Sequence, residues 1–157
     1  MKTRIVTLVA FLIALLSPLH AQQAASTKPP VGVPADATRF NGKWYRIYLE
    51  KTSWKHALEK CRSLGGQLAC VPDAPTQAFI SAFGKKLRLW IGATDEKVEG
   101  LWLWVDGAEM KYTAWGPNQP NSIPKENYLL LGPDGNWWDI TDSYAECVGF
   151  ICEWKGK

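Results

Sequence analysis

Two stretches of the chain carry the apolar spacing of amphipathic helices. In the first, over residues 54–64, apolar side chains recur three or four positions apart, as on one helical face. They are Trp54, Ala57, Leu58, Cys61 and Leu64. Thr52 or Ser53 can cap the start of this helix. Gly65 and Gly66 suit its end, because glycine tolerates a left-handed stop.

The second predicted helix covers about residues 74–83. Asp73 or Ala74 can cap it, and Pro75 fits the first turn, where no intrahelical N–H donor is needed. Gly84 is expected to end it. The expected buried face consists of Ala78, Phe79, Ala82 and Phe83.

Short apolar and aromatic runs between turn residues predict strands in the rest of the chain. These strands are 43–49, 67–71, 87–92, 101–105, 128–131, 136–140 and 148–154. Residues 111–127 have little periodicity and many prolines and asparagines, so they are expected to form a long irregular loop. Ordered loops of this length are usually functional. Two helices followed by many short strands in a mostly antiparallel sheet indicate an α+β fold.

The N-terminus has the features of a secretory signal. Lys2 and Arg4 precede a short apolar run, and Ala21 is a small residue at the expected cleavage point. We therefore expect a signal peptide at 1–21, a flexible proline-containing linker at 22–38 and one folded domain at 39–157, secreted and without a membrane span. Removing the signal brings the net charge of +3 close to neutral, which argues against nucleic acid as a partner.

All four cysteines, Cys61, Cys70, Cys147 and Cys152, lie in the predicted domain. An even number of cysteines in a secreted chain indicates disulfides, and the residues alone allow three pairings. Their spacing does not match a zinc site, since His56 is the single histidine of the expected mature chain and no Cys-x-x-Cys pair occurs.

A set of ordered motifs over residues 39–155 resembles a C-type lectin-like domain. The motifs are Trp54-x-x-Ala57-x-x-x-Cys61, Gly65-Gly66-x-Leu68-Ala69, Trp90-Ile91-Gly92, Trp102-x-Trp104-x-Asp106-Gly107, Trp115 and Phe150-Ile151-Cys152-Glu153. The resemblance implies a disulfide-stapled fold of two helices, antiparallel sheets and a long irregular loop. It also implies that Cys61 pairs with Cys152 and that Trp90, Trp102 and Trp104 belong to the core.

The second disulfide of that family has no counterpart in the expected place. Tyr128 stands where its first cysteine would be, and the partner position after Asp139 also lacks one. We predict that Cys70 pairs with Cys147 instead.

The resemblance also assigns a candidate calcium site. In sugar-binding members, calcium is held by a Glu-Pro-Asn or Gln-Pro-Asp triplet, a following acid, and an Asn-Asp pair after a tryptophan. On this chain the triplet residues are Gln119 and Asn121, the acid is Glu126, and the pair is Trp138 and Asp139. Four of these side chains offer oxygen, the ligand that Ca²⁺ prefers, and Trp138 offers none. A weakened or lost calcium site is therefore implied, together with the family's cis peptide bond before the triplet proline.

Trp138 has two interpretations. Neighbours in a strand face opposite ways, so burial of Trp137 would direct Trp138 toward the loop surface. There it would offer an aromatic plate to a sugar ring or a protein partner. Alternatively, it packs under the long loop and fills the volume of a lost calcium ion.

The chain has no sign of catalysis. His56 falls in the first helix, away from the long loop, and no nucleophile elbow, phosphate-binding loop or metal-binding histidine motif occurs. The sequence indicates a secreted carbohydrate-binding module, with Gln119, Asn121, Glu126, Trp138 and Asp139 as its ligand-binding residues. The alternative is a calcium-independent module that binds an extracellular protein. The Gln-Pro-Asn triplet mixes two sugar classes and selects neither.

Overall fold

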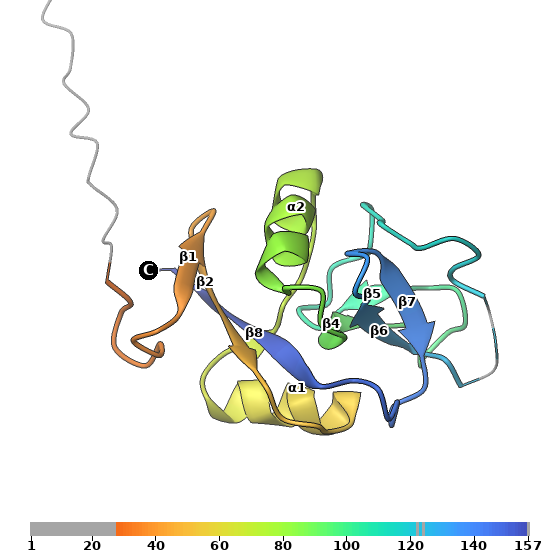
Figure 1. Cartoon of the computed structure of the whole chain (residues 1–157), viewed down its shortest axis with the longest axis horizontal. Coiled ribbons are helices and arrows are strands. Elements are labelled where there is room, and N and C mark those ends of the chain that lie inside the picture. The colour runs from red at the N-terminus through yellow and green to blue at the C-terminus, as the bar shows by residue number, and fades with distance from the viewer. Residues whose placement is uncertain (1–27, 122, 124, 157) are drawn as a thin grey trace, which may run out of the picture.

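The computed structural model describes residues 28–121, 123 and 125–156. The predicted signal peptide and the first part of the linker lie outside these residues. Eight strands and two helices follow one another along the described chain (Figure 1). They are β1 Thr38–Phe40, β2 Lys43–Tyr48, α1 Trp54–Ser63, β3 Gln67–Leu68, α2 Ala74–Phe83, β4 Leu89–Thr94, β5 Leu103–Trp104, β6 Tyr128–Leu131, β7 Trp137–Ile140 and β8 Gly149–Lys155.

Helix α1 forms as the sequence predicts. Ser53 is its N-cap, and its side chain accepts a hydrogen bond from the amide of His56, which satisfies one of the unpaired donors at the helix start. Trp54, Ala57 and Cys61 are buried on one face. The apolar spacing and the cap therefore account for both the extent and the orientation of this helix.

Helix α2 begins at the predicted place, with Asp73 as N-cap, but the predicted buried face is partly wrong. Ala78 and Ala82 are exposed, and the fully covered positions are Thr76, Gln77 and Ile80. The helix is rotated from the predicted orientation because Gln77 finds hydrogen-bond partners inside the protein, which removes the penalty for burying its amide.

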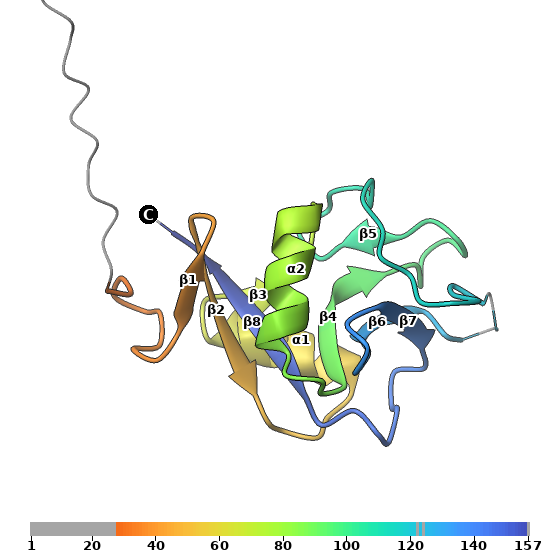
Figure 2. The same cartoon turned by 45° about the horizontal axis from the view of Figure 1, so that its top comes forward.

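The sheet places the last strand in the middle, in the order β1-β2-β8-β4-β6-β7, with β3 paired to β8 and β5 to β4. All pairs are antiparallel except β4 with β8, so the sheet is mostly antiparallel, as expected. Figures 1 and 2 show α1 and α2 on either side of β8. Each helix covers its own apolar cluster: Ile80 of α2 packs with Ile151 of β8, and Cys61 of α1 with Phe150 of β8.

One disulfide, Cys61–Cys152, joins α1 to β8 as the resemblance implied. The predicted Cys70–Cys147 disulfide is wrong, since both residues are free and buried. Cys70 belongs to the cluster under α2 and Cys147 to the cluster under α1, so the sheet lies between them. Burial raises the pKa of both thiols, that of Cys147 to about 11.

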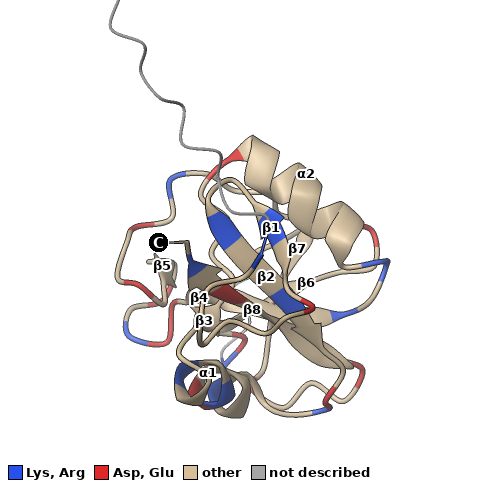
Figure 3. Cartoon of the chain, turned by 90° about the vertical axis from the view of Figure 1, so that its left-hand side faces the viewer, with Lys and Arg blue, Asp and Glu red and all other residues tan. Residues whose placement is uncertain are grey.

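The end of the predicted linker 22–38 packs on the domain. Ala37 is buried against the cluster under α1, and β1 begins at Thr38. Basic and acidic positions are interspersed on this side of the molecule, over α1, the strands and the loops (Figure 3). No helix within the described part of the chain has the length and apolar character needed to cross a membrane.

Candidate functional site

The long loop between β5 and β6 is bound to the edge strand β7 through residues 114–116. The amide of Trp137 donates to the carbonyl of Ala114 over 2.8 Å, and the amide of Gly116 donates to the carbonyl of Trp137 over 2.9 Å. A parallel bridge joins Trp115 to Trp137 at the same place. Residues 114–116, near the middle of the loop, therefore continue the sheet beyond β7.

A second contact brings the proline triplet to β7. The amide of Asn121 donates to Oδ2 of Asp139 over 3.0 Å, and Asp139 is only 1% exposed. The amide of Gln119 donates to the carbonyl of Gly116 over 3.1 Å. The Gln119–Pro120 peptide bond is cis, as expected. Two parts of the predicted site, Asn121 and Asp139, are thus in direct contact.

The end of the loop meets the end of β4. The amide of Asp95 donates to the carbonyl of Asn127 over 3.3 Å, and Oδ2 of Asp95 accepts from the amide of Gly100 over 2.8 Å. The amide of Glu126 donates to the carbonyl of Ile123 over 3.0 Å. These contacts join Asn127, the residue after Glu126, to the backbone of Asp95, an acid that the sequence analysis did not select.

Four acceptor oxygens at these places are buried without a hydrogen-bond partner in the described structure. They are Asp95 Oδ1, Gln119 Oε1, Glu126 Oε2 and Asn127 Oδ1. Burying an acceptor without a partner costs free energy, and a hard cation such as Ca²⁺ would compensate several oxygens at once. The donor chemistry at Gln119 and Glu126 therefore fits calcium.

Sequence reasoning did not select Asp95 or Asn127. The sequence offered one indication for each residue. Asp95 directly follows an apolar strand, and Asn127 directly follows the candidate ligand Glu126. Their proximity depends on the contact between the two loop ends, which no local pattern reveals.

Asn121 and Trp138 fit the calcium role less well. Asn121 is exposed, and its Oδ1 accepts from the amide of Ile123 over 2.9 Å in a local turn. Within the described residues, no group of three or more His, Cys, Asp or Glu side chains is arranged to hold a metal. The five positions that correspond to the family's calcium ligands therefore do not supply a complete set of oxygen ligands.

Trp138 packs at the start of the long loop. It is half-buried, and its indole nitrogen would lie 3.1 Å from a Cβ at Gly116 and 3.0 Å from one at Gly132. The guanidinium of Arg88 lies 5.8 Å from the ring centroid. Its strand neighbours Trp137 and Asp139 are buried, consistent with the alternation along a strand. These contacts favour packing under the loop over a free aromatic plate.

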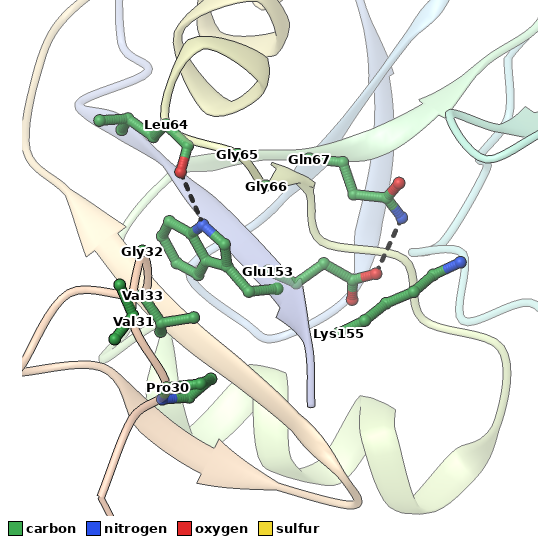
Figure 4. A pocket seen from close by; sticks show the side chains of 11 residues that line it. Pro30, Val31, Gly32, Val33, Leu64, Gly65, Gly66, Gln67, Glu153 and Lys155 are labelled. Atoms are coloured by element: carbon green, nitrogen blue, oxygen red, sulfur yellow. Dashed lines mark hydrogen bonds between the residues drawn. The ribbon is translucent and has the colours of Figure 1, made fainter. Parts of the chain in front are cut away.

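A cavity of about 430 Å³ lies elsewhere, between residues 30–33, the turn 64–67 and the end of β8 (Figure 4). Its charged group is engaged: Oε1 of Glu153 accepts from Gln67 over 2.9 Å and pairs with Lys43 Nζ over 2.7 Å. Burial raises the pKa of Glu153, and the Lys43 ammonium opposes this rise. In Figure 1 this region is at the C-terminal end of the molecule, opposite the long loop.

The family follows from comparison with known proteins. The model of the Lectin C-type domain family matches residues 50–154. The chain therefore belongs to the C-type lectin-like domain family, whose members are binding modules.

Individual relatives show how far the similarity extends. A hepatic lectin of Gallus gallus is 32% identical over 117 residues, which are 73% of this chain and 56% of the lectin. The chain thus spans about half the length of this curated relative.

Solved structures with a similar fold include a carbohydrate-recognition domain and a calcium-independent antifreeze protein. The cow carbohydrate-recognition domain of CD23, crystallised in the presence of a GlcNAc2Man3 oligosaccharide, superposes with a TM-score of 0.75 at 26% identity, over 80% of this chain and 97% of that one. A calcium-independent type II antifreeze protein gives a TM-score of 0.72 at 26% identity, over 78% and 94%.

Proposed function

We propose that this chain is a secreted carbohydrate-recognition module with a weakened calcium site, formed where the long loop meets β7 and the end of β4. The observation that carries the proposal is the pair of buried, uncompensated oxygens on Gln119 and Glu126. Each buried oxygen without a hydrogen-bond partner destabilises the fold. In a loop that binds no cation, apolar or hydrogen-bonded side chains would therefore be favoured at these two positions.

Gln119, Glu126 and Asp139 would hold the ion. Bound calcium supplies a positive centre for hydroxyl oxygens of a sugar. The residues carry a formal charge of about −2, and Trp138 contributes no oxygen, so affinity is expected near the weak end for extracellular sites, about 10⁻³ M. The hepatic lectin and the CD23 domain support a sugar ligand for the same fold.

A calcium-independent module that binds an extracellular protein is the second candidate. It is supported by the packing of Trp138 and by the engagement of the Asn121 side chain in a local turn. The calcium-independent antifreeze protein shows that a related domain functions without the ion.

A glycan array read with calcium and with a chelator separates the two candidates. We expect sugar binding that chelation abolishes and that Glu126→Gln weakens at least about tenfold, since one charged ligand is lost. Glu59→Gln is the matched control: it removes an exposed carboxylate on α1 and should bind like the wild type.

Two results on the array would contradict the proposal. Glycan binding that is equal with and without calcium rejects the calcium site while keeping a sugar ligand, and loss of that binding in Trp138→Ala would assign the indole to the contact. No glycan binding in either condition rejects the carbohydrate function.

Secretion is tested separately, by expressing the full chain in a secreting host and sequencing the N-terminus, with cleavage after Ala21 as the expected result.

A further inference from the structure

A buried glutamine on α2 is connected to the candidate site by hydrogen bonds. Gln77 is 9% exposed although it lies within a helix whose covered face would ordinarily be apolar. Its Oε1 accepts from the indole Nε1 of Trp137 over 2.8 Å. Its Nε2 lies 2.6 Å from the carbonyl oxygen of Gly135 and 3.0 Å from Oγ of Ser81. The amide is therefore used at both ends.

These bonds join α2 to the turn between β6 and β7. Ser81 adds a bond of 2.9 Å from its Oγ to the same Gly135 carbonyl. Gly135 has φ +82, and a Cβ there would lie 2.8 Å from Ser81 Oγ, so the turn approaches the helix as closely as glycine permits. In Figures 1 and 2 this turn lies beside α2 in both views.

Trp137 then carries the connection into the loop. Its indole is held by Gln77, and its ring packs edge-on against Trp115 at 5.8 Å and Tyr112 at 5.9 Å, both residues of the loop. Its main chain pairs with Ala114 and Gly116 on either side of Trp115. A rotation of this one indole would therefore disturb both the ring contacts and the backbone pairing of the loop.

We propose that Gln77 is a positioning residue for the binding loop: by fixing the Trp137 indole and the Gly135 carbonyl from α2, it keeps residues 114–116, and through them Gln119, in place. The link from Gly116 to Gln119 is the hydrogen bond of 3.1 Å between them. The statement about ligand binding rests on the proposed function, whereas the statement about loop geometry does not.

The test is amide hydrogen exchange, measured residue by residue on the full chain. In Gln77→Met, which keeps the side-chain length but makes neither bond, exchange at Gly116 and Trp137 should rise about tenfold or more, because local opening of the loop becomes easier. Amides in the β2–β8 pairing, which lies nearer the opposite edge of the sheet from β7, should exchange as in the wild type. An equal rise at both places would show a merely structural role and overturn the proposal.

Two further variants separate the contributions. Ser81→Ala removes one bond to the Gly135 carbonyl and leaves the Trp137 indole held, so Gly116 should stay protected. Gln77→Glu keeps an acceptor for the indole but cannot donate to the Gly135 carbonyl and leaves a buried carboxylate against it, so Gly116 should exchange as fast as in Gln77→Met. Wild-type protection in Gln77→Glu would show that the bond to the Gly135 carbonyl is not needed and would overturn the proposal.

Calcium alone, titrated by calorimetry, provides the functional readout. Where the wild type binds calcium, Gln77→Met should weaken binding several-fold, and unchanged binding would contradict the role of Gln77 in placing Gln119. A wild type that binds no calcium rejects the calcium site of the proposed function, and the exchange experiment then decides the positioning role by itself.

Discussion

Asp73 shows how one side chain defines the start of a helix. Its Oδ1 accepts from the amide of Thr76 over 2.8 Å, and hydrogen bonds from the side chain and the amide of Thr76 lower the pKa of the Asp73 carboxyl. Replacing Asp73 with alanine should lower the free energy of unfolding by about 1 kcal/mol at pH 7, the usual effect of losing an N-cap. Urea denaturation of both proteins measures the difference.

The pH dependence of this difference follows from the direction of the shift. Because the folded-state pKa lies below the unfolded one, the stabilisation is present above the ordinary aspartate pKa and is lost as the pH falls through the folded-state value. The gap between wild type and Asp73→Ala should therefore narrow below about pH 4. Asp73→Ser, which keeps a capping oxygen, should stay close to the wild type at pH 7. An undiminished gap at pH 2 would show that the effect does not come from the carboxylate.

At the scale of elements, Tyr128 occupies the place where the family's second disulfide would begin. Its ring lies 5.1 Å from that of Trp54 at the start of α1, and Lys55 Nζ is 5.6 Å from the ring centroid. Lys55 also pairs with Glu96 over 2.5 Å. Packing and charge therefore attach the start of β6 to α1.

Tyr128→Ala should lower the free energy of unfolding by about 3 kcal/mol or more, because a buried ring is removed beneath α1. Tyr128→Phe keeps the ring and should lose about 1 kcal/mol or less. Lys55→Gln, which breaks an exposed ion pair, is expected to leave the stability nearly unchanged. Thermal and urea unfolding give these values. A phenylalanine variant as unstable as the alanine variant would assign the attachment to the hydroxyl instead of the ring.

Local signals predicted the elements better than their contacts. The caps Ser53 and Asp73 act within three residues, so the sequence locates both helix starts. The buried face of α2 was partly wrong because the partner of Gln77 is Trp137, 60 residues away. The pairing of Cys70 with Cys147 failed for a similar reason, since only the complete sheet shows that they lie on opposite faces.

The candidate site, too, was predictable only in part from the sequence. The resemblance, whose motifs are ordered along the chain, selected all five candidate residues, Gln119, Asn121, Glu126, Trp138 and Asp139. Asp95 was missed, because its contact with Asn127 joins two loops and has no sequence pattern of its own. A motif identifies residues that have a fixed spacing, whereas a buried orphaned oxygen is recognised only in the folded molecule.

At the scale of the whole molecule, the last strand holds the first part of the domain together. β8 lies between β2 and β4 and pairs with β2 over six positions, from Lys43 with Lys155 to Tyr48 with Phe150. The long loop leaves this frame between β5 and β6, away from both ends of the described chain (Figure 1). The loop can therefore vary in sequence and ligand while the β2–β8 frame remains the same.

The Cys61–Cys152 disulfide closes this frame, and its removal tests how far the fold depends on it. The two cysteines are 91 residues apart, so the crosslink restricts a long loop of the unfolded chain, a stabilisation of about 4–5 kcal/mol in the chain-entropy model. The double variant Cys61→Ala, Cys152→Ala should lose about that amount in urea denaturation, and dithiothreitol should then have no further effect. Cys147→Ala, which removes a free thiol, should keep its sensitivity to dithiothreitol. If reductant leaves the wild type as stable as before, the β2–β8 pairing and the two apolar clusters hold the domain without the crosslink.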